Sequence, residues 1–577
     1  MKKILEYPYD WNEILRKSRE IRDYLLSRSE GLISKKIAIM GGSTTSHIKT
    51  ILELFCLKKG IRPDFYESNY GKYYEEIIFD DEEFYNFNPD VILIHTNFFN
   101  LTHLPSINDD DETVKNKIHL EFDKYQQIWS KINKNLNSVI LQNNFEFPLF
   151  RSLGDLDLIL NYGNTSFVNR INYKFSEAVK NIPNLYINDI NYMSSRIGLE
   201  NWINFKFWRA YKYFIDFKFM PIYCNKISSK IGSIYGLSKK SIVTDLDNVM
   251  WGGVIGDDGP DKISIGEDTS EGEGFSYYQK YLKELYERGI TLNISSKNEE
   301  KVALEGINNK SNTLKIEDFN YAKINWLPKS QNIKDISEKL NISLNSIVYV
   351  DDSKFEQDEV RNILPQIEIP DTNEDPINNI NIIDQSFFFE NHAILNEDIN
   401  RKDFYKSKLK FDETKTKFKN YDDFLKSLDM KMQIIKLNED NLKRSTQLNN
   451  KTNQFNLVTK RLTEVEMKSF IENEKKIAYC IKLNDKFGDS GIISLILLSK
   501  SENVVNIDNW LMSCRVFKRG LESAFMNYLV KHLRSESYEH LHATYIPSKK
   551  NRFVENLFDG LGFQRLSGDK DGTKKYH

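Results

Sequence analysis

Short apolar runs alternate with amphipathic segments along the first 235 residues. The runs at residues 36–40, 91–95 and 138–142 have the length and composition of buried strands, and helical sequence lies between them. Residues 11–26 show the spacing of an amphipathic helix. Because strands that alternate with helices favour a parallel sheet with covered faces, we expect an α/β domain over residues 1–235.

A second alternation of strands and helices covers residues 236–385. Strands are expected at residues 241–244, 291–295 and 346–350, and helices at residues 276–288 and 330–340. This rhythm predicts a second parallel α/β domain, in which helices connect successive strands. The polar stretch at residues 371–383 is interpreted as a linker.

The pattern changes beyond residue 386. Residues 400–428 are helical in pattern, and strands are expected at residues 432–437, 476–483, 491–498 and 504–511. A helix at residues 520–534 and a strand at residues 540–545 follow. Several strands with few helices predict an α+β domain over residues 386–577, with a helical lead-in.

Composition narrows the classes of function. The chain has 577 residues, of which 40% are hydrophobic, so it has enough apolar material for packed cores and is not disordered throughout. Lysine and arginine (80) nearly balance aspartate and glutamate (83), which argues against a nucleic-acid partner. The longest apolar run, at residues 491–498, is far shorter than the ~20 residues that cross a membrane, so no membrane association is expected.

The N-terminal residues and the cysteines indicate a cytoplasmic protein. Residues 1–11 lack the apolar run of a signal peptide. The cysteines stand far apart and form no CxxC pair, so we expect reduced thiols. They are Cys56, Cys224, Cys480 and Cys514.

Two pairs of carboxylates follow predicted strands of the second domain. Asp245 and Asp247 come directly after residues 241–244, and Asp351 and Asp352 follow residues 346–350. In an α/β sheet, ligands bind at the carboxyl ends of the strands. Four converging carboxylates need a counter-charge, and hard oxygen ligands in this number suit Mg²⁺.

A hydroxyl and an ammonium group lie between the two acidic pairs in the sequence. Ser296 ends a predicted strand, and Lys329 precedes a predicted helix. Beside a magnesium site, these two groups are what the oxygens of a phosphate require. The sequence therefore predicts a site for a phosphorylated small molecule.

These pieces, in this order, resemble the motifs of the haloacid dehalogenase (HAD) phosphohydrolase superfamily, which has a Rossmann-like α/β fold. The resemblance implies that Asp245 is the nucleophile and forms an aspartyl-phosphate. It implies that Asp247 is the general acid/base and also a metal ligand through its backbone carbonyl. Ser296 and Lys329 would hold the transferring phosphoryl group, and the remaining ligands of Mg²⁺ would be Asp245, Asp351 and Asp352.

Longer runs of sequence resemble one group of this superfamily, the FkbH-like proteins of HAD subfamily IIIC, which have a minimal cap. They are MWGGVIGDDG at residues 250–259, SKN at 296–298, INWLPKSQN at 324–332 and VDDS at 350–353. The SKN run adds Lys297 and Asn298 to the expected phosphate-binding residues. Val249 replaces the family's Thr, and Ser353 with Lys354 replaces Asn-Pro.

The FkbH-like resemblance implies a specific reaction. The HAD site would remove the C3 phosphate of 1,3-bisphosphoglycerate, and the glyceryl unit would be loaded onto the phosphopantetheine arm of a separate acyl carrier protein. One alternative is a phosphatase or acyltransferase that acts on a sugar or a surface polysaccharide precursor. Another is a scaffold with an inactive HAD site, but the intact Asp247 argues against it.

The third domain resembles the C-terminal part of the same group, with a GNAT-type acyltransferase fold. The matching runs are NKTNQFNL at residues 450–457, FGDSG at 487–491 and LMSCRVFKRG at 511–520. In GNAT folds a loop at a helix start cradles a pyrophosphate with its backbone N–H groups. Lys518 stands where a Gly is expected, which disfavours CoA and favours a carrier's single phosphodiester. The alternative is that Lys518 and Arg519 are charged residues of a solvated helix start. The expected acyl- or pantetheine-binding residues are Asn453, Asn456, Arg515, Lys518, Arg519 and Gly520.

Cys514 is the cysteine with a catalytic environment in this sequence. It adjoins Arg515 and precedes a predicted helix start, and both features favour the thiolate. It is a candidate to carry a transient glyceryl thioester; the alternative is the buried packing role that a free Cys usually has. Many family members have a Cys just before SKN, and Ser295 occupies that position here.

The first domain resembles SGNH hydrolases. The run GGSTT at residues 41–45 follows a predicted strand and is similar to the first SGNH block, with Ser43 at the nucleophile position. Asn204 stands where the late catalytic Asp belongs, and no His follows it there. We expect this domain to be hydrolytically inactive and to bind a carrier or control substrate access. Alternatively, Ser43 caps the following helix.

Overall fold

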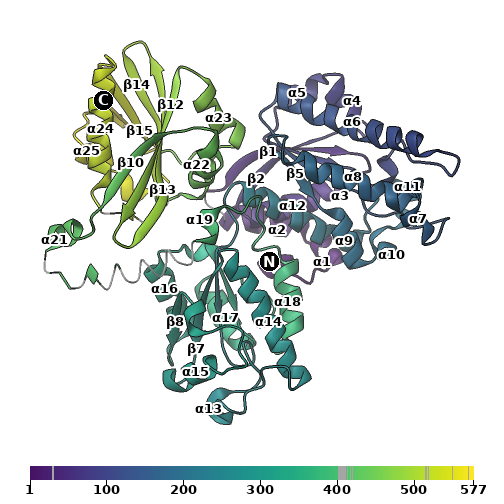
Figure 1. The fold of residues 1–577 in the computed structure, drawn as a ribbon, viewed down its shortest axis with the longest axis horizontal. Helices are drawn as coiled ribbons and strands as arrows, with labels where there is room; N and C mark the ends of the chain where they lie inside the picture. The colour runs from purple at the N-terminus through teal and green to yellow at the C-terminus, as the bar shows by residue number, and fades with distance from the viewer. Residues whose placement is uncertain are drawn as a thin grey trace. The chain divides into compact units, whose positions relative to one another are not determined.

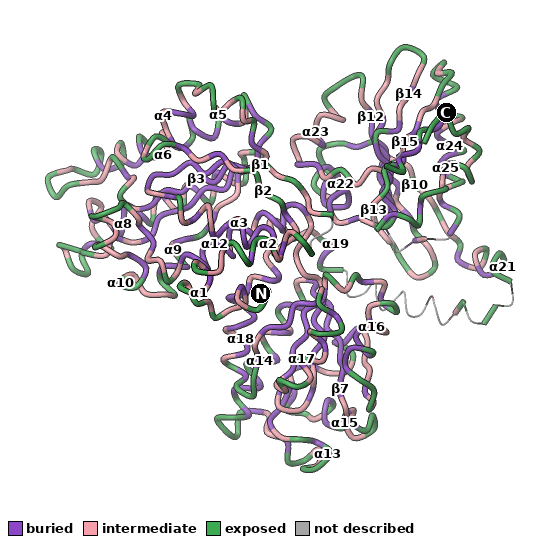
Figure 2. Tube along the Cα trace, turned by 180° about the vertical axis from the view of Figure 1, so that it is seen from behind, coloured by how far each residue is buried: buried purple, intermediate pink, exposed green. Residues whose placement is uncertain are grey.

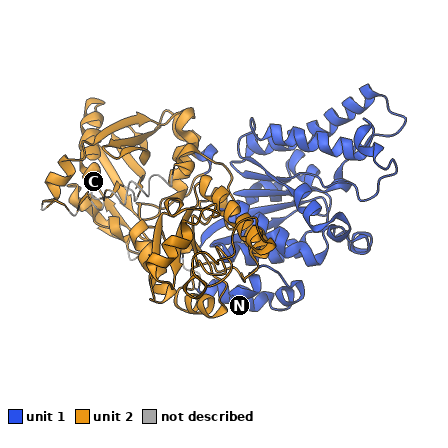
Figure 3. Cartoon of the chain, turned by 60° about the horizontal axis from the view of Figure 1, so that its bottom comes forward, with its two compact units in different colours: residues 1–232, 463–466 blue, residues 233–462, 467–577 orange. Residues whose placement is uncertain are grey.

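The computed structural model describes residues 1–28, 31–400, 411, 414–415, 417–418, 420–513, 516–517, 519–548, 550–568 and 571–577. The described residues form a mixed α/β fold with three sheets (Figure 1), which confirms the predicted fold class. The strands of the sheets are largely buried, and the outer faces of the helices are exposed (Figure 2). The chain divides into two compact units, residues 1–232 with 463–466 and residues 233–462 with 467–577 (Figure 3).

The first unit contains a five-stranded parallel sheet in the order β2-β1-β3-β4-β5. Its strands are β1 (Ile33–Gly41), β2 (Ile61–Glu67), β3 (Val91–His95), β4 (Val139–Asn143) and β5 (Leu185–Asn188). The helix expected at residues 11–26 forms as two helices, α1 (Trp11–Arg16) and α2 (Ser18–Arg28). Longer helices in this unit are α3 (Ser46–Lys58), α6 (Asp111–Asn135), α8 (Asn164–Ala178) and α12 (Met220–Ile234). Apolar residues of β1, β3, β4, α6 and α8 form one core.

A four-stranded parallel sheet in the order β8-β7-β6-β9 lies in the second unit. Its strands are β6 (Ser241–Thr244), β7 (Thr291–Ser296), β8 (Tyr321–Ile324) and β9 (Ile347–Val350). The helices are α14 (Ser270–Glu287), α15 (Glu300–Ile307), α16 (Lys329–Leu340) and α17 (Lys354–Ile363). Between β6 and α14 the chain forms one short helix, α13 (Ile255–Asp258), so the insertion that follows the first strand is small.

The prediction of a linker at residues 371–383 is wrong. Pro376–Gln385 forms a helix, α18, whose Ile383 is 1% exposed and belongs to the same core as β6 and α14. The Asp375 side chain accepts hydrogen bonds from two backbone N–H groups at the helix start, where Pro376 occupies the first turn. The asparagine-rich composition of the segment conceals this helix in the sequence.

The C-terminal sheet has the order β10-β12-β13-β14-β15-β17-β16, with β11 paired to β14. Its strands are β10 (Lys431–Lys436), β11 (Phe455–Asn456), β12 (Lys476–Asp485), β13 (Gly488–Ser501), β14 (Val504–Met512), β15 (His540–Tyr545), β16 (Arg565–Gly568) and β17 (Lys574–Tyr576). The helices include α21 (Tyr421–Lys426), α22 (Glu439–Lys451), α23 (Glu464–Glu472) and α24 (Leu521–Ser535). Much of the helix expected at residues 400–428 lies outside the described residues.

One pairing in this sheet is parallel. β14 and β15 pair only from Val504 to Ile507, and every other pairing is antiparallel. Beyond Ile507, β11 takes the place beside β14. The backbone of Leu457 then links both strands, since its N–H donates to Trp510 O (3.1 Å) and its carbonyl accepts from Ile546 N (2.9 Å).

Across the described ranges, no helix combines the length and the apolar character that a membrane crossing requires.

Candidate active site

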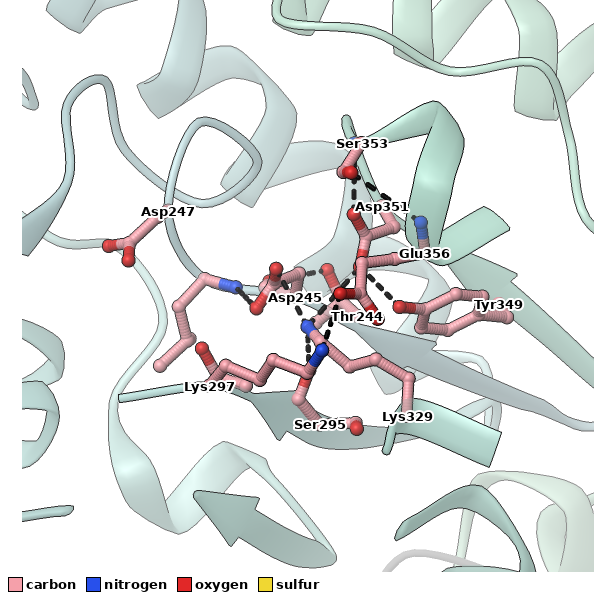
Figure 4. Close-up of polar contacts among 12 residues, drawn as sticks. Thr244, Asp245, Asp247, Ser295, Lys297, Lys329, Tyr349, Asp351, Ser353 and Glu356 are labelled. Carbon is pink, nitrogen blue, oxygen red and sulfur yellow. Dashed lines mark hydrogen bonds and ion pairs between the residues drawn. The ribbon is translucent and has the colours of Figure 1, made fainter. Parts of the chain in front are cut away.

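The pairing of β6 with β9 brings the two predicted acidic pairs together. Thr244 lies opposite Val350 in the register, and Asp245 N donates to Val350 O (2.9 Å). The next residues of the two strands, Asp245 and Asp351, therefore leave the sheet side by side. Oxygens of Asp245, Asp351 and Asp352 all lie within 4.8 Å of one another (Figure 4 labels the first two).

Lys329 supplies a positive charge to this cluster. It is the first residue of α16, its side chain is 1% exposed, and its Nζ lies 2.7 Å from Asp245 Oδ2 and 3.2 Å from Asp351 Oδ2. It also donates to the carbonyl of Ser295 (2.8 Å). Burial lowers the pKa of Lys329, but the two carboxylates outweigh burial and raise it overall. The lysine therefore stays charged between its partners.

The carboxylates outnumber the cations at this point. Asp351 is buried, and its oxygens accept hydrogen bonds from Tyr349 Oη and from Ser353 N. Burial and the charge of Asp245 raise the pKa of Asp351 to about 7, and the same two causes raise the pKa of Asp352. A divalent cation would relieve this repulsion, and oxygen-only ligands are those that Mg²⁺ prefers. The residues present therefore fit Mg²⁺.

Asp247 is held apart from the cluster. Its Oδ1 accepts hydrogen bonds from Trp251 Nε1 (3.0 Å) and Ile255 N (3.1 Å), and its Oδ2 accepts one from Asn298 Nδ2 (2.8 Å). Burial raises the pKa of Asp247. In Figure 4 its carboxyl group lies away from Asp245 and Asp351. This orientation suits proton transfer, while the expected metal contact through the Asp247 backbone carbonyl stays a prediction.

The SKN run ends β7 beside these groups. Ser296 Oγ accepts a hydrogen bond from Asn298 Nδ2 (3.1 Å), so Asn298 connects Ser296 to Asp247. Lys297 forms an ion pair with Glu356 Oε1 (2.5 Å). The expected contacts of Ser296, Lys297 and Asn298 with a phosphate stay predictions.

Three residues of the site were not assigned a role from the sequence: Tyr349, Trp251 and Glu356. Each acts through a side-chain contact with a predicted residue, respectively Asp351, Asp247 and Lys297. Trp251 and Glu356 lie within or beside the motif runs. Their place in the sequence therefore indicates that they are near the site, but not what they contact there. Tyr349 lies in an apolar strand, so the sequence predicts only that its ring packs in the hydrophobic core.

The predicted acyl-binding residues have other partners or lie outside the described residues. Cys514, Arg515 and Lys518 are outside them. Arg519 is 7% exposed and forms an ion pair with Asp485 (2.5 Å), and Gly520 precedes α24 with a φ of 74°. The amide groups of Asn453 and Asn456 contact Arg461, Thr452 and Thr459. Their contact with an acyl or pantetheine group stays a prediction.

In the first unit, Ser43 follows β1 and is 2% exposed. The alternative that it caps the next helix is wrong, because α3 begins at Ser46 with Thr45 at the cap position, and Ser43 Oγ has no hydrogen-bond partner within the described part of the chain. Asn204 caps α11 (Phe205–Tyr211) and donates to Asp216 Oδ2 (2.6 Å). Both the oxygen and the nitrogen of its side-chain amide therefore have structural partners.

The sequence profile of the family described as "FkbH, N-terminal domain" matches residues 36–231. No curated protein sequence matches the chain. The N-terminal part of BF1531 from Bacteroides fragilis, whose crystal structure contains a phosphatase domain complexed with Mg, is similar with a TM-score of 0.60 and 24% identity. The match covers 65% of this chain and 99% of that chain, and it shows the fold alone.

A ribosomal-protein-S18-alanine N-acetyltransferase from Escherichia coli aligns over 25% of this chain and 92% of its own length, with 15% identity and a TM-score of 0.20. A domain from Methanocaldococcus jannaschii aligns over 26% of this chain and 97% of its own length, with 16% identity and a TM-score of 0.22. Both TM-scores are too low to indicate a shared overall fold. By the profile match, residues 36–231 are similar to the FkbH N-terminal domain family.

Proposed function

We propose that the chain is a Mg²⁺-dependent phosphatase of the HAD type that works through an aspartyl-phosphate on Asp245. The observation that carries this proposal is the group of three carboxylates around a buried lysine at the ends of β6 and β9. The Mg in the BF1531 structure, which has a similar fold, supports the choice of metal.

The residues divide the reaction between them. The carboxylate of Asp245 attacks phosphorus, the bond between phosphorus and the substrate oxygen breaks, and Asp247 gives that oxygen a proton. Asp247 then takes a proton from water as the water oxygen attacks phosphorus, which releases phosphate and restores Asp245. Lys329 stabilises the negative oxygens during both steps. Mg²⁺, held by Asp245, Asp351 and Asp352, would supply the positive charge that lets a carboxylate approach a phosphate.

For the substrate, we propose 1,3-bisphosphoglycerate, with an acyl carrier protein as the acceptor. The phosphopantetheine thiol of the carrier attacks the C1 carbonyl, and the bond from C1 to the phosphate oxygen breaks. Phosphate leaves from C1, the thiol proton passes to solvent, and the HAD site hydrolyses the C3 phosphate. The motif runs at residues 250–259, 296–298 and 324–332 and the FkbH N-terminal domain match support this assignment.

Intact-mass spectrometry tests the proposed function. The full chain is incubated with Mg²⁺, 1,3-bisphosphoglycerate and a holo carrier protein encoded near its gene. With the wild-type chain, we expect a glyceryl adduct on the carrier. With Asp245→Asn, the adduct that lacks the C3 phosphate should be absent. Release of phosphate with no adduct on the carrier or on Cys514 would instead indicate a phosphatase with another substrate.

A further inference from the structure

A groove of about 480 Å³ runs between α6 and α8 in the first unit, far along the chain from the proposed active-site residues. The two helices pack against each other (Figure 1). Its walls are Lys115, Ile118 and His119 from α6, and Arg170, Tyr173 and Lys174 from α8. On each helix these residues have the i, i+3, i+4 spacing of a single face, so two matching faces meet across the groove.

The cationic side chains of the groove have no acidic partner. Among the described residues, Lys115 and His119 form no ion pair, Arg170 donates to the amide oxygen of Asn161, and Lys174 lies 5.1 Å from the centre of the Phe122 ring. Glu177 pairs with Lys180, and the carboxylate of Asp111 accepts a hydrogen bond from Asn161, the same residue that Arg170 contacts. Lys115, Arg170 and Lys174 therefore carry positive charge on both walls without a direct ion pair among the described residues.

Other lysines of α6 behave differently. Lys117 pairs with Asp109 (2.6 Å), Lys124 with Glu121 (3.3 Å) and Lys131 with Asp80 (2.7 Å). These three lysines outside the groove are paired, whereas Lys134, also outside the groove, is exposed and forms no ion pair among the described residues. The groove differs from an ordinary solvated helix face because cationic side chains of two helices line one hollow.

The exposed apolar surface of the groove comes mainly from Tyr173. Ile118 is buried at 5% exposure, whereas the Tyr173 side chain is 67% exposed. An exposed aromatic ring with a polar tip, flanked by cations, is the composition of an anchor point at a protein interface. A single small anion would gain little here, because the cations stand on solvent-exposed walls. A nucleic acid would call for a longer array of cations than the three side chains of Lys115, Arg170 and Lys174.

We propose that this groove docks an acidic amphipathic helix of a partner protein. The apolar face of that helix packs on Ile118 and Tyr173, and its carboxylates pair with Lys115, Arg170 and Lys174 on both walls. The proposal concerns binding alone, so it stands or falls separately from the proposed chemistry at Asp245.

The test uses the full chain and a fluorescent helical peptide with Glu on its polar face and Leu on its apolar face. Binding is followed by fluorescence anisotropy at low and at high salt. We expect Lys115→Glu/Arg170→Glu/Lys174→Glu to weaken binding at least about tenfold. The control is Lys134→Glu, which changes an exposed lysine of the same helix outside the groove that forms no ion pair among the described residues, and it should leave binding unchanged. Circular dichroism checks the fold, and the milder Lys115→Gln/Lys174→Gln variant repeats the test if the triple variant is unfolded.

A scrambled peptide distinguishes an amphipathic helix from other polyanions as the occupant of the groove. Tyr173→Ala should weaken binding of the amphipathic peptide but not that of a scrambled peptide with the same composition. Equal binding by the triple variant and the wild type would overturn the proposal, as would equal losses with the Lys134→Glu control. Tighter binding of a DNA duplex or complete competition by inorganic phosphate would also overturn it, because each would show a different occupant.

Discussion

Replacing Lys329 with Met removes the cation that lies between Asp245 and Asp351 while keeping a side chain of similar length. In the metal-free protein, two carboxylates then lose their partner in a site where Lys329 is 1% exposed and Asp351 is fully buried. Removing one partner of a buried ion pair costs about 3–5 kcal/mol. The side chain of Asp245 is 15% exposed, so we expect the lower half of that range.

Protonation of Asp351 sets how this cost depends on pH. Its pKa is raised to about 7 by burial and by Asp245, so ionising Asp351 destabilises the fold as the pH rises toward 7. Below that pH a proton on Asp351 removes one of the two unpaired charges. Lys329 itself lowers the pKa of Asp351, so its removal raises that pKa further and moves the effect to higher pH. The Lys329→Met variant should therefore lose about 1–2 kcal/mol at pH 6, rising toward about 3–4 kcal/mol at pH 8 and above.

Thermal unfolding in EDTA and in excess Mg²⁺ measures the effect. The relevant transition is the one that Mg²⁺ shifts in the wild type, and a loss of 3–4 kcal/mol lowers its midpoint by about 6–16 °C. Mg²⁺ should stabilise Lys329→Met more than the wild type, because it replaces the missing positive charge. Lys323→Met, which breaks a partly exposed ion pair with Asp335, should cost at most about 1 kcal/mol. Equal stability of Lys329→Met and the wild type in EDTA at pH 8 would refute the reasoning.

Three further substitutions test other contacts. Burial raises the pKa of Glu146 to about 8, so ionisation of Glu146 destabilises the fold between about pH 4.5 and pH 8. In urea unfolding, the neutral Glu146→Gln variant should gain about 2–4 kcal/mol of stability over the wild type as the pH rises from 5 to 8. Parallel pH profiles of the two proteins would contradict this. Tyr349→Phe removes the hydrogen bond to Asp351 and should weaken Mg²⁺ binding about tenfold by calorimetry, whereas an unchanged affinity would exclude this positioning role. Asp247→Asn should slow breakdown of the phosphoenzyme about 10²–10⁴-fold in single-turnover quench experiments. An acyl phosphate is used as the substrate because its good leaving group needs little protonation. Normal turnover would remove Asp247 from its proposed role.

The sequence predicts the strands that carry the site because they are short, apolar and followed by the motif residues. Residues 241–244 form β6 with the predicted bounds, and parallel pairing with β9 then places Asp245 beside Asp351. Edge strands are harder to predict: β8 (Tyr321–Ile324) and β5 (Leu185–Asn188) are short and partly exposed, so their hydrophobic signal is weak.

Contacts between distant residues set the limit of prediction at the site. Asp247 is turned away from the carboxylate cluster by Trp251 and Asn298, and the rotamer that meets both cannot be inferred from a motif. Lys297 and Glu356 are 59 residues apart and meet only because β7 and α17 adjoin the same sheet edge. The C-terminal motif run at residues 450–457 was assigned to acyl binding, yet its Phe455–Leu457 segment hydrogen-bonds along β14.

The central claim is that Asp245 receives a phosphoryl group. The most direct measurement is acid-quenched mass spectrometry of the full chain after brief exposure to Mg²⁺ and an acyl phosphate, with peptide mapping of the modified residue. The account predicts a phosphoryl adduct on the peptide that contains Asp245, more abundant in Asp247→Asn than in the wild type and absent in Asp245→Asn. Phosphate release that persists in Asp245→Asn, with no adduct on that peptide in any variant, would contradict it.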